Sequence, residues 1–421
     1  MSTFGALGNI FKKQRFYFEG DGEMVVDLDP TAALDQRRDE LIKARQTGNF
    51  PGDEMIVNMG PQHPSTHGVL RLELVLDGEI VKKVTPHIGY LHRNFEKHAE
   101  NVGFNEVIPY TDRLDYLAAM NMNHGYCLAV EKLLGIKELP KKVEYIRVIC
   151  AEFQRIASHL MAIGTFGLDV GAVTPFLWAF RDRERILDLF EWLSGARMLY
   201  NYIWIGGLAR DMPSGWIKKA TEFLDEFERN MGEFNRLLSG NHIFIKRTAD
   251  VGVLPPEVAI NCGATGPVLR GSGIKWDCRK DEPYSIYPQF EFDIPVGEGR
   301  YGPIGSAFDR YFVRIREIEE AVKILRQALP QCPEQGDVKE AIPRRMKPAA
   351  GAECYVRSEA PRGEIGFYIR SNGTDIADRV RCRSSCFVHV SLLDEISRGC
   401  MVADMIINIG SIDIVLGEVD R

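Results

Sequence analysis

The chain has 421 residues, a mass of 47.6 kDa and a formal net charge of −7, from 52 basic and 59 acidic side chains. At this length about three quarters of the unfolded surface can be buried, and usual domain sizes predict about two to three domains. The acidic balance argues against a nucleic-acid partner, since such partners require a strongly basic face. Nine cysteines at irregular spacing are typical of a reducing compartment rather than a disulfide scaffold.

No segment has the composition of a membrane-spanning helix. The most apolar stretch, 406–416, contains Asn408 and Asp413 and is shorter than the about 20 residues that such a helix needs. The N-terminus lacks a secretory signal, because its basic residues follow the short apolar patch 4–7 instead of preceding it. We expect a soluble or peripheral protein that meets a membrane only through partners.

The first 110 residues divide into two regions. Residues 1–52 are expected to be an extension with a short helix at 35–40. Residues 53–110 predict a small antiparallel sheet domain, with Asp77-Gly78 as a hairpin turn between strands of alternating apolar residues. The predicted strands are 55–59, 70–76 and 80–84.

From residue 111 to 345 the apolar residues recur at intervals of three and four, which predicts long amphipathic helices packed as a bundle. The expected helices begin at a Thr111 or Asp112 cap, after Pro140 and at a Thr174-Pro175 cap, and two more span 214–240 and 306–329. Residues 346–421 are predicted to form a C-terminal α/β segment, with strand-like stretches followed by a short helix. The predicted class is α+β and mainly helical.

Two patterns resemble cofactor sites. Gly297-x-Gly299-x-x-Gly302 follows the strand-like stretch 290–296, but a dinucleotide fold needs a helix to begin at those glycines, and Pro303 intervenes. We therefore favour an ordinary glycine loop.

The second pattern is a partial metal site formed by Cys382, Cys386 and His389. It lacks a fourth ligand, and the arginines of 379–383 would repel a divalent cation. A strand of arginines that faces an acidic partner is the simpler interpretation, and we expect no metal.

The segment 60–68 is the strongest candidate for a site. It places His63 and His67 in one loop with two prolines and two hydroxyl side chains, and Pro64 and Gly68 argue against a helix. Imidazoles in a rigid loop suit proton delivery or ligand capture. The alternative is a loop whose histidines only bond to neighbouring backbone.

This loop closely resembles the signature of the quinone-site (D) subunit of bacterial complex I, the NADH-quinone oxidoreductase. The resemblance covers about 54–421 in the same order and continues through further motifs, in 87–93, 113–116, 169–175, 266–273, 361–364 and 417–421. It implies a fold shared with the large subunits of nickel–iron hydrogenases, whose nickel is held by two Cys-x-x-Cys pairs. Here Gly89-Tyr-Leu-His92 takes the place of the early pair and 412–415 contains no cysteine, which disfavours a nickel–iron centre.

The resemblance also implies roles for individual residues. His67 and Tyr116 would hydrogen-bond the two carbonyl oxygens of a quinone, Asp169 would be the acidic partner of His67, and His63 is a secondary candidate. These residue types suit the reaction, because quinone reduction develops negative charge on two oxygens that donors can stabilise and protonate. Without the resemblance there are simpler interpretations: Tyr116 could be an ordinary core residue, and Asp169 could only hydrogen-bond to the backbone.

One residue departs from the family pattern. Many members carry a histidine after the Arg-Met of 195–198, near the terminal iron–sulfur cluster of the neighbouring subunit, and this sequence has Leu199. Leucine cannot donate a hydrogen bond or carry charge, and local electrostatics tune a cluster's potential. We therefore expect a terminal cluster of lower potential and weaker pH dependence, and a low-potential quinone, menaquinone rather than ubiquinone.

The resemblance supplies the partners as well. It implies a small iron–sulfur B subunit that carries the cluster, the C and I subunits, and a membrane H subunit, on the cytoplasmic side of the bacterial inner membrane. The chain would then serve proton-pumping quinone reduction without being active alone. The competing interpretations are a hydrogenase-type large subunit and a non-catalytic scaffold of the same fold.

Overall fold

The computed structural model describes residues 16–19, 23–26, 54–343 and 345–421. The chain divides into a unit Met1–Met55 and a unit Ile56–Arg421. The first contains an antiparallel pair of strands, β1 (Phe16–Glu19) and β2 (Glu23–Val26). The short helix predicted at 35–40 lies outside the described residues, and the division into 1–52, 53–110, 111–345 and 346–421 stays a prediction.

The predicted N-terminal sheet is present. It has three strands in the order β3-β4-β5, namely β3 (Glu54–Met59), β4 (Arg71–Asp77) and β5 (Ile80–His87). Asp77 pairs with Ile80 across the turn at Gly78, as Asp-Gly predicts, because the glycine adopts a positive φ of 59°. Leu72, Leu74 and Leu76 alternate toward the core, which fixes the register of β4.

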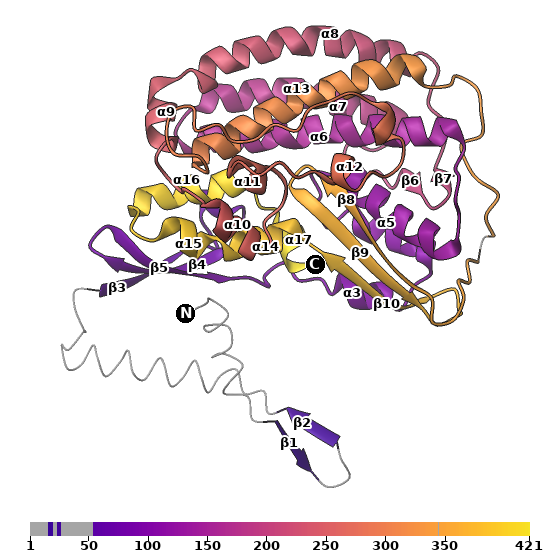
Figure 1. Cartoon of the computed structure of the whole chain (residues 1–421), viewed down its shortest axis with the longest axis horizontal. Helices are drawn as coiled ribbons and strands as arrows, with labels where there is room; N and C mark the ends of the chain where they lie inside the picture. Colours follow the sequence, from indigo (N-terminus) through magenta and orange to yellow (C-terminus); the bar gives the residue numbers. More distant parts are fainter. Residues whose placement is uncertain (1–15, 20–22, 27–53, 344) are drawn as a thin grey trace. The chain divides into compact units, whose positions relative to one another are not determined.

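Four long helices form the bundle at the top of Figure 1. They are α6 (Lys141–Asp169), α7 (Val173–Ser194), α8 (Trp216–Phe234) and α13 (Ala307–Gln331). Helix α6 packs against both α7 and α13, and most of its residues are buried, so it is the central helix. Pro140 precedes α6, as predicted, and Ser306, near which the last long helix was expected to begin, caps α13 through Asp309 N.

A second sheet lies below the bundle. Its strands β8 (Glu353–Ala360), β9 (Gly363–Ser371) and β10 (Ala377–Arg383) are antiparallel in the order β10-β9-β8, and α5 (Ala119–Leu134) packs on β8 and β9. The C-terminal helices contact the bundle and the N-terminal sheet: α14 (Ser385–Ser391), α15 (Leu393–Ser397), α16 (Val402–Ile412) and α17 (Leu416–Asp420). The α+β, mainly helical class is therefore confirmed.

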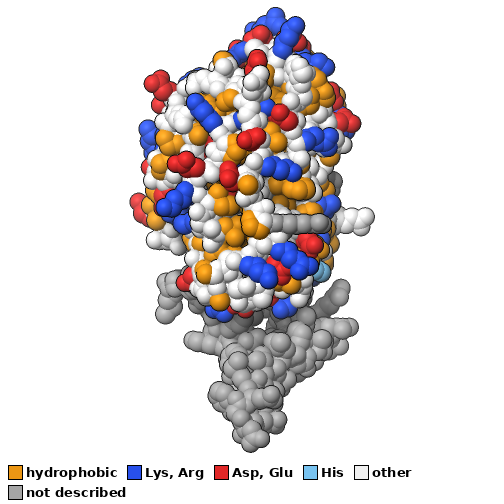
Figure 2. Space-filling view, turned by 90° about the vertical axis from the view of Figure 1, so that its right-hand side faces the viewer, with side chains coloured by type: hydrophobic (Ala, Val, Ile, Leu, Met, Phe, Trp, Pro, Cys, Tyr) orange, Lys and Arg blue, Asp and Glu red, His pale blue; other side chains and the backbone are white. Residues whose placement is uncertain are grey.

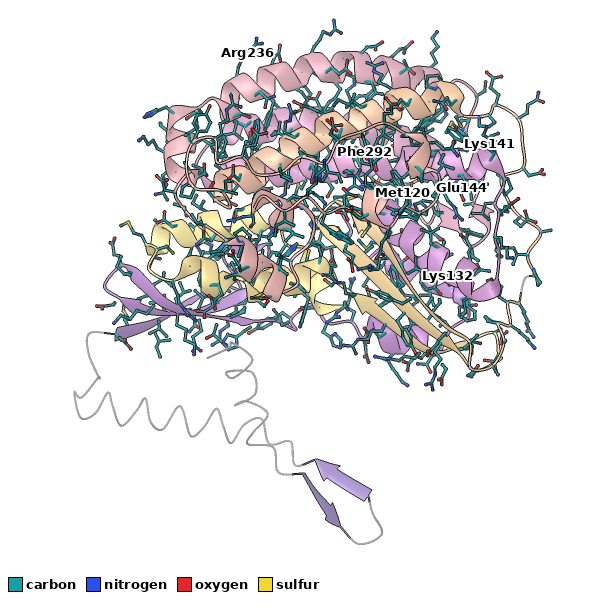
Figure 3. All side chains as sticks on the ribbon, viewed as in Figure 1. Met120, Lys132, Lys141, Glu144, Arg236 and Phe292 are labelled. Atoms are coloured by element: carbon teal, nitrogen blue, oxygen red, sulfur yellow. The ribbon has the colours of Figure 1, made fainter. Side chains whose placement is uncertain are left out.

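Shorter elements complete the described part. They are η1 (Pro64–Thr66), α3 (Phe95–Ala99), η2 (Phe104–Val107), α4 (Ile108–Thr111), β6 (Ile203–Trp204), β7 (Gly207–Leu208), the π-helical turn η3 (Asn235–Ser239), α9 (His242–Thr248), α10 (Pro256–Asn261), α11 (Gly266–Gly271), α12 (Cys278–Asp281) and η4 (Tyr287–Gln289). Figure 3 shows Met120 of α5 in the interior and Arg236 of η3 at the outer edge of the bundle. None of the described helices combines the length and apolarity that crossing a membrane requires.

Three local predictions were wrong. Residues 112–118 form turns rather than the start of a helix, and α5 begins only at Ala119. Helix α7 begins at Val173 after Ala172, so Thr174 is not its cap. Residues 290–296 belong to no strand, because no segment within 54–343 or 345–421 pairs with them.

Candidate functional site

The loop between β3 and β4 holds both histidines in fixed positions. His63 caps the turn η1, its Nδ1 accepting from Ser65 N at 3.2 Å. The buried Thr66 hydroxyl donates to the carbonyls of Pro61 and His63 at 3.1 and 2.9 Å. His67 follows with a positive φ of 52°, a conformation that is uncommon among non-glycine residues. The predicted loop is thus present, and it contains the single 3-10 turn η1.

His67 is partly buried between groups of opposite charge. Burial lowers the pKa of His67 from its ordinary value, the Asp413 carboxylate raises it and the Arg362 guanidinium lowers it. The sum of these effects favours the neutral imidazole. A neutral imidazole has one N–H donor and one acceptor, so it can hold a polar ligand through the donor and be reprotonated at the other nitrogen.

Tyr116 lies in the turns 112–118, partly buried. Burial raises the pKa of its phenol, and Arg362 opposes this effect, so the hydroxyl is a neutral donor at physiological pH. The turn is packed against α17: a Cβ on Gly417 would lie 2.6 Å from the Leu114 carbonyl oxygen. Only glycine allows this close approach of α17 to the backbone that carries Tyr116.

Arg362 links the two candidate residues. Its Nη1 donates to Asp115 Oδ2 at 2.7 Å and to Ser158 Oγ at 3.0 Å, while its Nη2 donates to Asp413 Oδ1 at 3.2 Å. Arg362 is 1% exposed, and its charge acts on both His67 and Tyr116. The charge of this buried acid–arginine–acid cluster therefore acts on both a loop imidazole and a turn phenol.

Asp169 is the last residue of α6. Burial raises the pKa of this carboxyl to about 6, against a hydrogen bond from Ser65. A Cβ on Gly410 would lie 2.8 Å from Asp169 Oδ2, so α16 also passes close to it. Asp169 thus supports the histidine loop through Ser65, and the carboxylate that acts on His67 is Asp413. Its pairing with His67 stays a prediction.

Three residues of the site, Asp115, Arg362 and Asp413, were not among the predicted ones. Asp115 and Arg362 lie inside motifs that carry the family resemblance, and Asp413 interrupts an apolar stretch, a pattern typical of a buried functional acid. Asp413 also has a positive φ of 49°. Their partnership joins segments 51 and 247 positions apart, so no local pattern could predict it.

A second buried ionic cluster lies deeper in the bundle. Glu317 of α13 accepts from His159 Nε2 at 2.9 Å and from Arg270 Nε at 2.8 Å, and Arg270 Nη1 donates to Glu359 at 2.9 Å. Burial raises the pKa of Glu317, but the charge of Arg270 and the hydrogen bond from His159 outweigh this effect. The pKa of Glu317 therefore lies below its usual range. This cluster connects α6, α11, α13 and β8 and stabilises the scaffold behind the site, provided that every charge remains paired.

The partial metal motif has other partners. The Cys386 thiol donates to Glu418 Oε2 at 3.3 Å and His389 Nε2 donates to the Thr265 carbonyl at 3.1 Å. No group of three or more potential metal ligands occurs in the described residues. Arg379 pairs with Glu96 and Glu100 at 2.6 and 2.7 Å, which confirms the expected acidic partner for the arginines of this strand.

The loop 89–92, expected where hydrogenases place their early cysteine pair, is held by a carboxylate. Asp420 Oδ1 accepts from Gly89 N at 2.9 Å and Oδ2 from Leu91 N at 2.6 Å. The Asp420 carbonyl accepts from His92 Nδ1 at 2.6 Å. Helix α17 is therefore fixed to this loop as well as to the Tyr116 turn.

Comparisons of the sequence with known proteins identify relatives of this chain. A family model described as "Respiratory-chain NADH dehydrogenase, 49 Kd subunit" matches residues 169–352 and 342–421. The D subunit of NADH-quinone oxidoreductase from Chlorobium luteolum is 55% identical over 372 residues, which cover 88% of this chain and 94% of that protein. The D subunit from Chlorobaculum tepidum is 54% identical, with 88% and 92% covered, and the D 1 subunit from Cytophaga hutchinsonii is 53% identical, with 89% and 97% covered.

These matches define the class, a subunit of a respiratory-chain oxidoreductase. The chain belongs to the family of NADH-quinone oxidoreductase D subunits, the complex I 49 kDa subunit family. It is accordingly a subunit of an enzyme complex.

Proposed function

We propose that this subunit forms the quinone-binding cavity of a proton-pumping NADH-quinone oxidoreductase and supplies donors for quinone reduction. One observation carries the proposal: His67 and Tyr116, from distant segments, both lie under the influence of Arg362, which is bound between Asp115 and Asp413. A quinone has two carbonyl oxygens on opposite sides of its ring. Two neutral donors near one charged cluster match that pattern.

The proposed role of the two donors is to stabilise and protonate the reduced quinone. Negative charge develops on both oxygens as the quinone is reduced, and an N–H and an O–H placed there stabilise it and can transfer their protons. Asp413 favours the protonated form of His67, so it assists return of a proton to the imidazole. Asp169 and His63 hold the histidine loop through Ser65.

The proposal includes partners that the family suggests. Electrons would come from an iron–sulfur cluster in the small B subunit, with the C, I and membrane H subunits as further neighbours. The assembly would lie on the cytoplasmic side of the bacterial inner membrane. Leu199 supports menaquinone over ubiquinone, because an apolar side chain near the cluster cannot stabilise added negative charge.

The test is to make two single variants of the assembled complex, His67→Gln and Tyr116→Phe. We expect kcat/KM for quinone to fall about 10²–10⁴-fold, the usual contribution of a positioned proton donor. NADH oxidation with an artificial acceptor that bypasses quinone should be unchanged. His242→Gln and Tyr301→Phe are matched controls, because both side chains are exposed and lie on other elements.

The outcomes separate the competing functions. Full quinone reductase activity in both variants, with assembly intact, would favour a non-catalytic scaffold. Stoichiometric nickel in the purified complex would favour a hydrogenase-type large subunit. Loss of quinone reduction with the artificial acceptor reaction retained would support the proposal.

A further inference from the structure

Strand β8 forms one edge of the second sheet. Among the described strands it pairs only with β9, and Figure 1 shows β8 on the side of the sheet nearest the bundle. The tight turn between Ala360 and Gly363 sets the pairing, because the two residues that flank such a turn bond to each other. Alternate residues of β8, from Cys354 to Ala360, therefore bond to β9. The residues between them direct their backbone N–H and C=O groups away from β9.

The hydrogen bonds of these outward groups agree with this direction. Glu359 N donates to the Tyr284 hydroxyl at 3.1 Å, and the Glu359 carbonyl accepts from Arg155 Nη2 at 2.7 Å. The Tyr355 carbonyl accepts only a long hydrogen bond, from Lys132 Nζ at 3.4 Å. The chain itself thus satisfies the C-terminal end of this edge and leaves the N-terminal end nearly open.

Three backbone groups at the open end have no partner. The N–H groups of Tyr355 and Arg357 and the Arg357 carbonyl make no hydrogen bond within the part of the chain that the structure describes. An unpaired strand edge is a template for another strand, and proteins usually cover or obstruct it. No strand or isolated bridge within 54–343 or 345–421 pairs with this edge. The edge at 353–357 can therefore accept a strand from outside the chain.

A groove of about 940 Å³ lies along this edge. Its walls come from the C-terminal part of α5, from the connection 135–139 and from the segment 282–285. Tyr355, Val356 and Arg357 of β8 line the same groove, so the strand edge and the groove coincide. A strand rises about 3.3 Å per residue, and the open edge therefore offers a length of about 16 Å.

The charges without a counter-charge in this groove are mainly basic. Lys132 and Lys137 line it, both are exposed, and neither has a carboxylate partner among the described residues. The acidic side chains that line the groove already have partners in this chain: Glu131 with Arg147, Glu282 with Arg357, and Glu144 with the Ser285 hydroxyl. A carboxylate from outside would thus meet two ammonium groups that lack a counter-charge.

We propose that the edge of β8 at 353–357 binds an extended, acidic segment of another subunit of the complex, which adds a strand to this sheet. Main-chain hydrogen bonds to Tyr355 and Arg357 supply the affinity, and carboxylates opposite Lys132 and Lys137 select the partner. The alternative is that Lys132 only shields an edge that faces solvent, which is a common protection of edge strands. The inference concerns assembly and does not depend on the quinone site.

Hydrogen exchange of the assembled complex, resolved to single amides, tests the added strand. We expect the amides of Tyr355 and Arg357 to be protected like that of Val356, which pairs with β9 inside this chain. Fast exchange of Tyr355 and Arg357 beside a protected Val356 would show an edge that faces solvent, and the proposal would be wrong. This measurement needs no variant, so it decides the matter even if the variants below fail to fold.

A proline at position 355 tests whether the backbone carries the contact. Tyr355→Pro removes an N–H group that this chain does not use, so β8 can still pair with β9. We expect the purified complex of this variant to lose one subunit. Tyr355→Ala is the matched control, because it removes the same side chain but keeps the N–H group, and it should retain that subunit. The same subunit composition in both variants would contradict an added strand.

Carbodiimide cross-linking of the intact complex tests the charge, because this reagent joins a lysine amine to a carboxylate in contact with it. We expect cross-links from Lys132 or Lys137 to one segment of another subunit. The double variant Lys132→Arg with Lys137→Arg should assemble normally but lose these cross-links, since arginine keeps the charge and does not react.

Charge reversal completes this test. Lys132→Glu with Lys137→Glu should release the cross-linked subunit, whereas Lys218→Glu, at an exposed position of α8, should not. Cross-links confined to this chain or to a second copy of it, or full assembly after the double reversal, would refute the proposed partner.

Discussion

Arg362 and Asp115 are 247 positions apart in the chain, yet Arg362 Nη1 donates to Asp115 Oδ2 at 2.7 Å where neither side chain is exposed. Asp413 completes the cluster from the other side at 3.2 Å. Arg314 Nε lies 3.8 Å from Asp413 Oδ2, so two acids and two arginines meet beside the loop of His67. The polarity of the candidate site is thus determined by residues that come together only in the folded chain.

Replacement of Arg362 by methionine should destabilise the protein strongly. The change keeps most of the side-chain volume but leaves Asp115 buried without its cation and Asp413 with Arg314 alone, a loss of about 3–5 kcal/mol for a broken buried pair. Thermal unfolding and assembly yield measure the effect. Arg316→Met, at an exposed i,i+3 pair with Glu319, should change little; equal losses in both variants would contradict the role of the cluster.

Gly417→Ala should displace the Tyr116 turn. The added methyl would lie 2.6 Å from the Leu114 carbonyl oxygen and 2.9 Å from that of Arg113, and these backbone atoms must move. We expect a cost of about 1–3 kcal/mol and a higher KM for quinone. Gly232→Ala is the control, because a Cβ there meets nothing within 4 Å and alanine favours the helix by about 0.5–1 kcal/mol. An unchanged KM in Gly417→Ala would separate Tyr116 from quinone binding.

Asp169→Asn should show a stability gain that depends on pH. The folded protein raises the pKa of Asp169 from 3.8 to about 6, so it binds more protons than the unfolded chain between these values. Stability therefore falls as pH rises through this window, and the penalty remains above it. The melting temperature of the variant relative to wild type should increase from pH 5 to pH 7. A difference that is constant with pH would show that Asp169 is not perturbed.

Leu199→His should install the histidine that the family resemblance leads us to expect at this position, beside the cluster that we propose for the partner subunit. We expect the cluster midpoint potential to rise and to become more pH-dependent, because an imidazole can bind a proton when the cluster is reduced. Redox titration of the complex at several pH values measures both properties. A steep pH slope already present in the wild-type complex would count against the role given to Leu199.

Long periodic segments were the most predictable part of the fold. The starts of α6 and α13 follow from Pro140 and Ser306, because apolar spacing and capping are local properties. The 112–118 segment was mistaken for helix since its apolar spacing is helical. There the Asp115 carboxylate accepts from Leu117 N at 3.1 Å and pairs with Arg362, and this tertiary partner overrides the local preference.

The candidate site was predictable only in part. The loop of His63 and His67 was visible from its composition, and Tyr116 from its motif. Asp115, Arg362 and Asp413 were not, because their importance lies in burial and in partners far along the chain. Figure 2 shows side chains of both charges interspersed with apolar ones on one face, so the surface there offers no single chemical signal either.

The spacing of the Arg362 contacts has a consequence for biogenesis. Its hydrogen-bond partners come from positions 51, 204 and 247 residues away, so this buried polar cluster forms only after nearly all of the fold exists. Contacts of such long range form late and slowly. A partly folded chain would have an apolar interior but would not bind the ligand. Binding of a ligand or a tight-binding inhibitor would therefore favour the fully folded state by mass action. Inhibitor binding could thus serve as an assay of completed maturation.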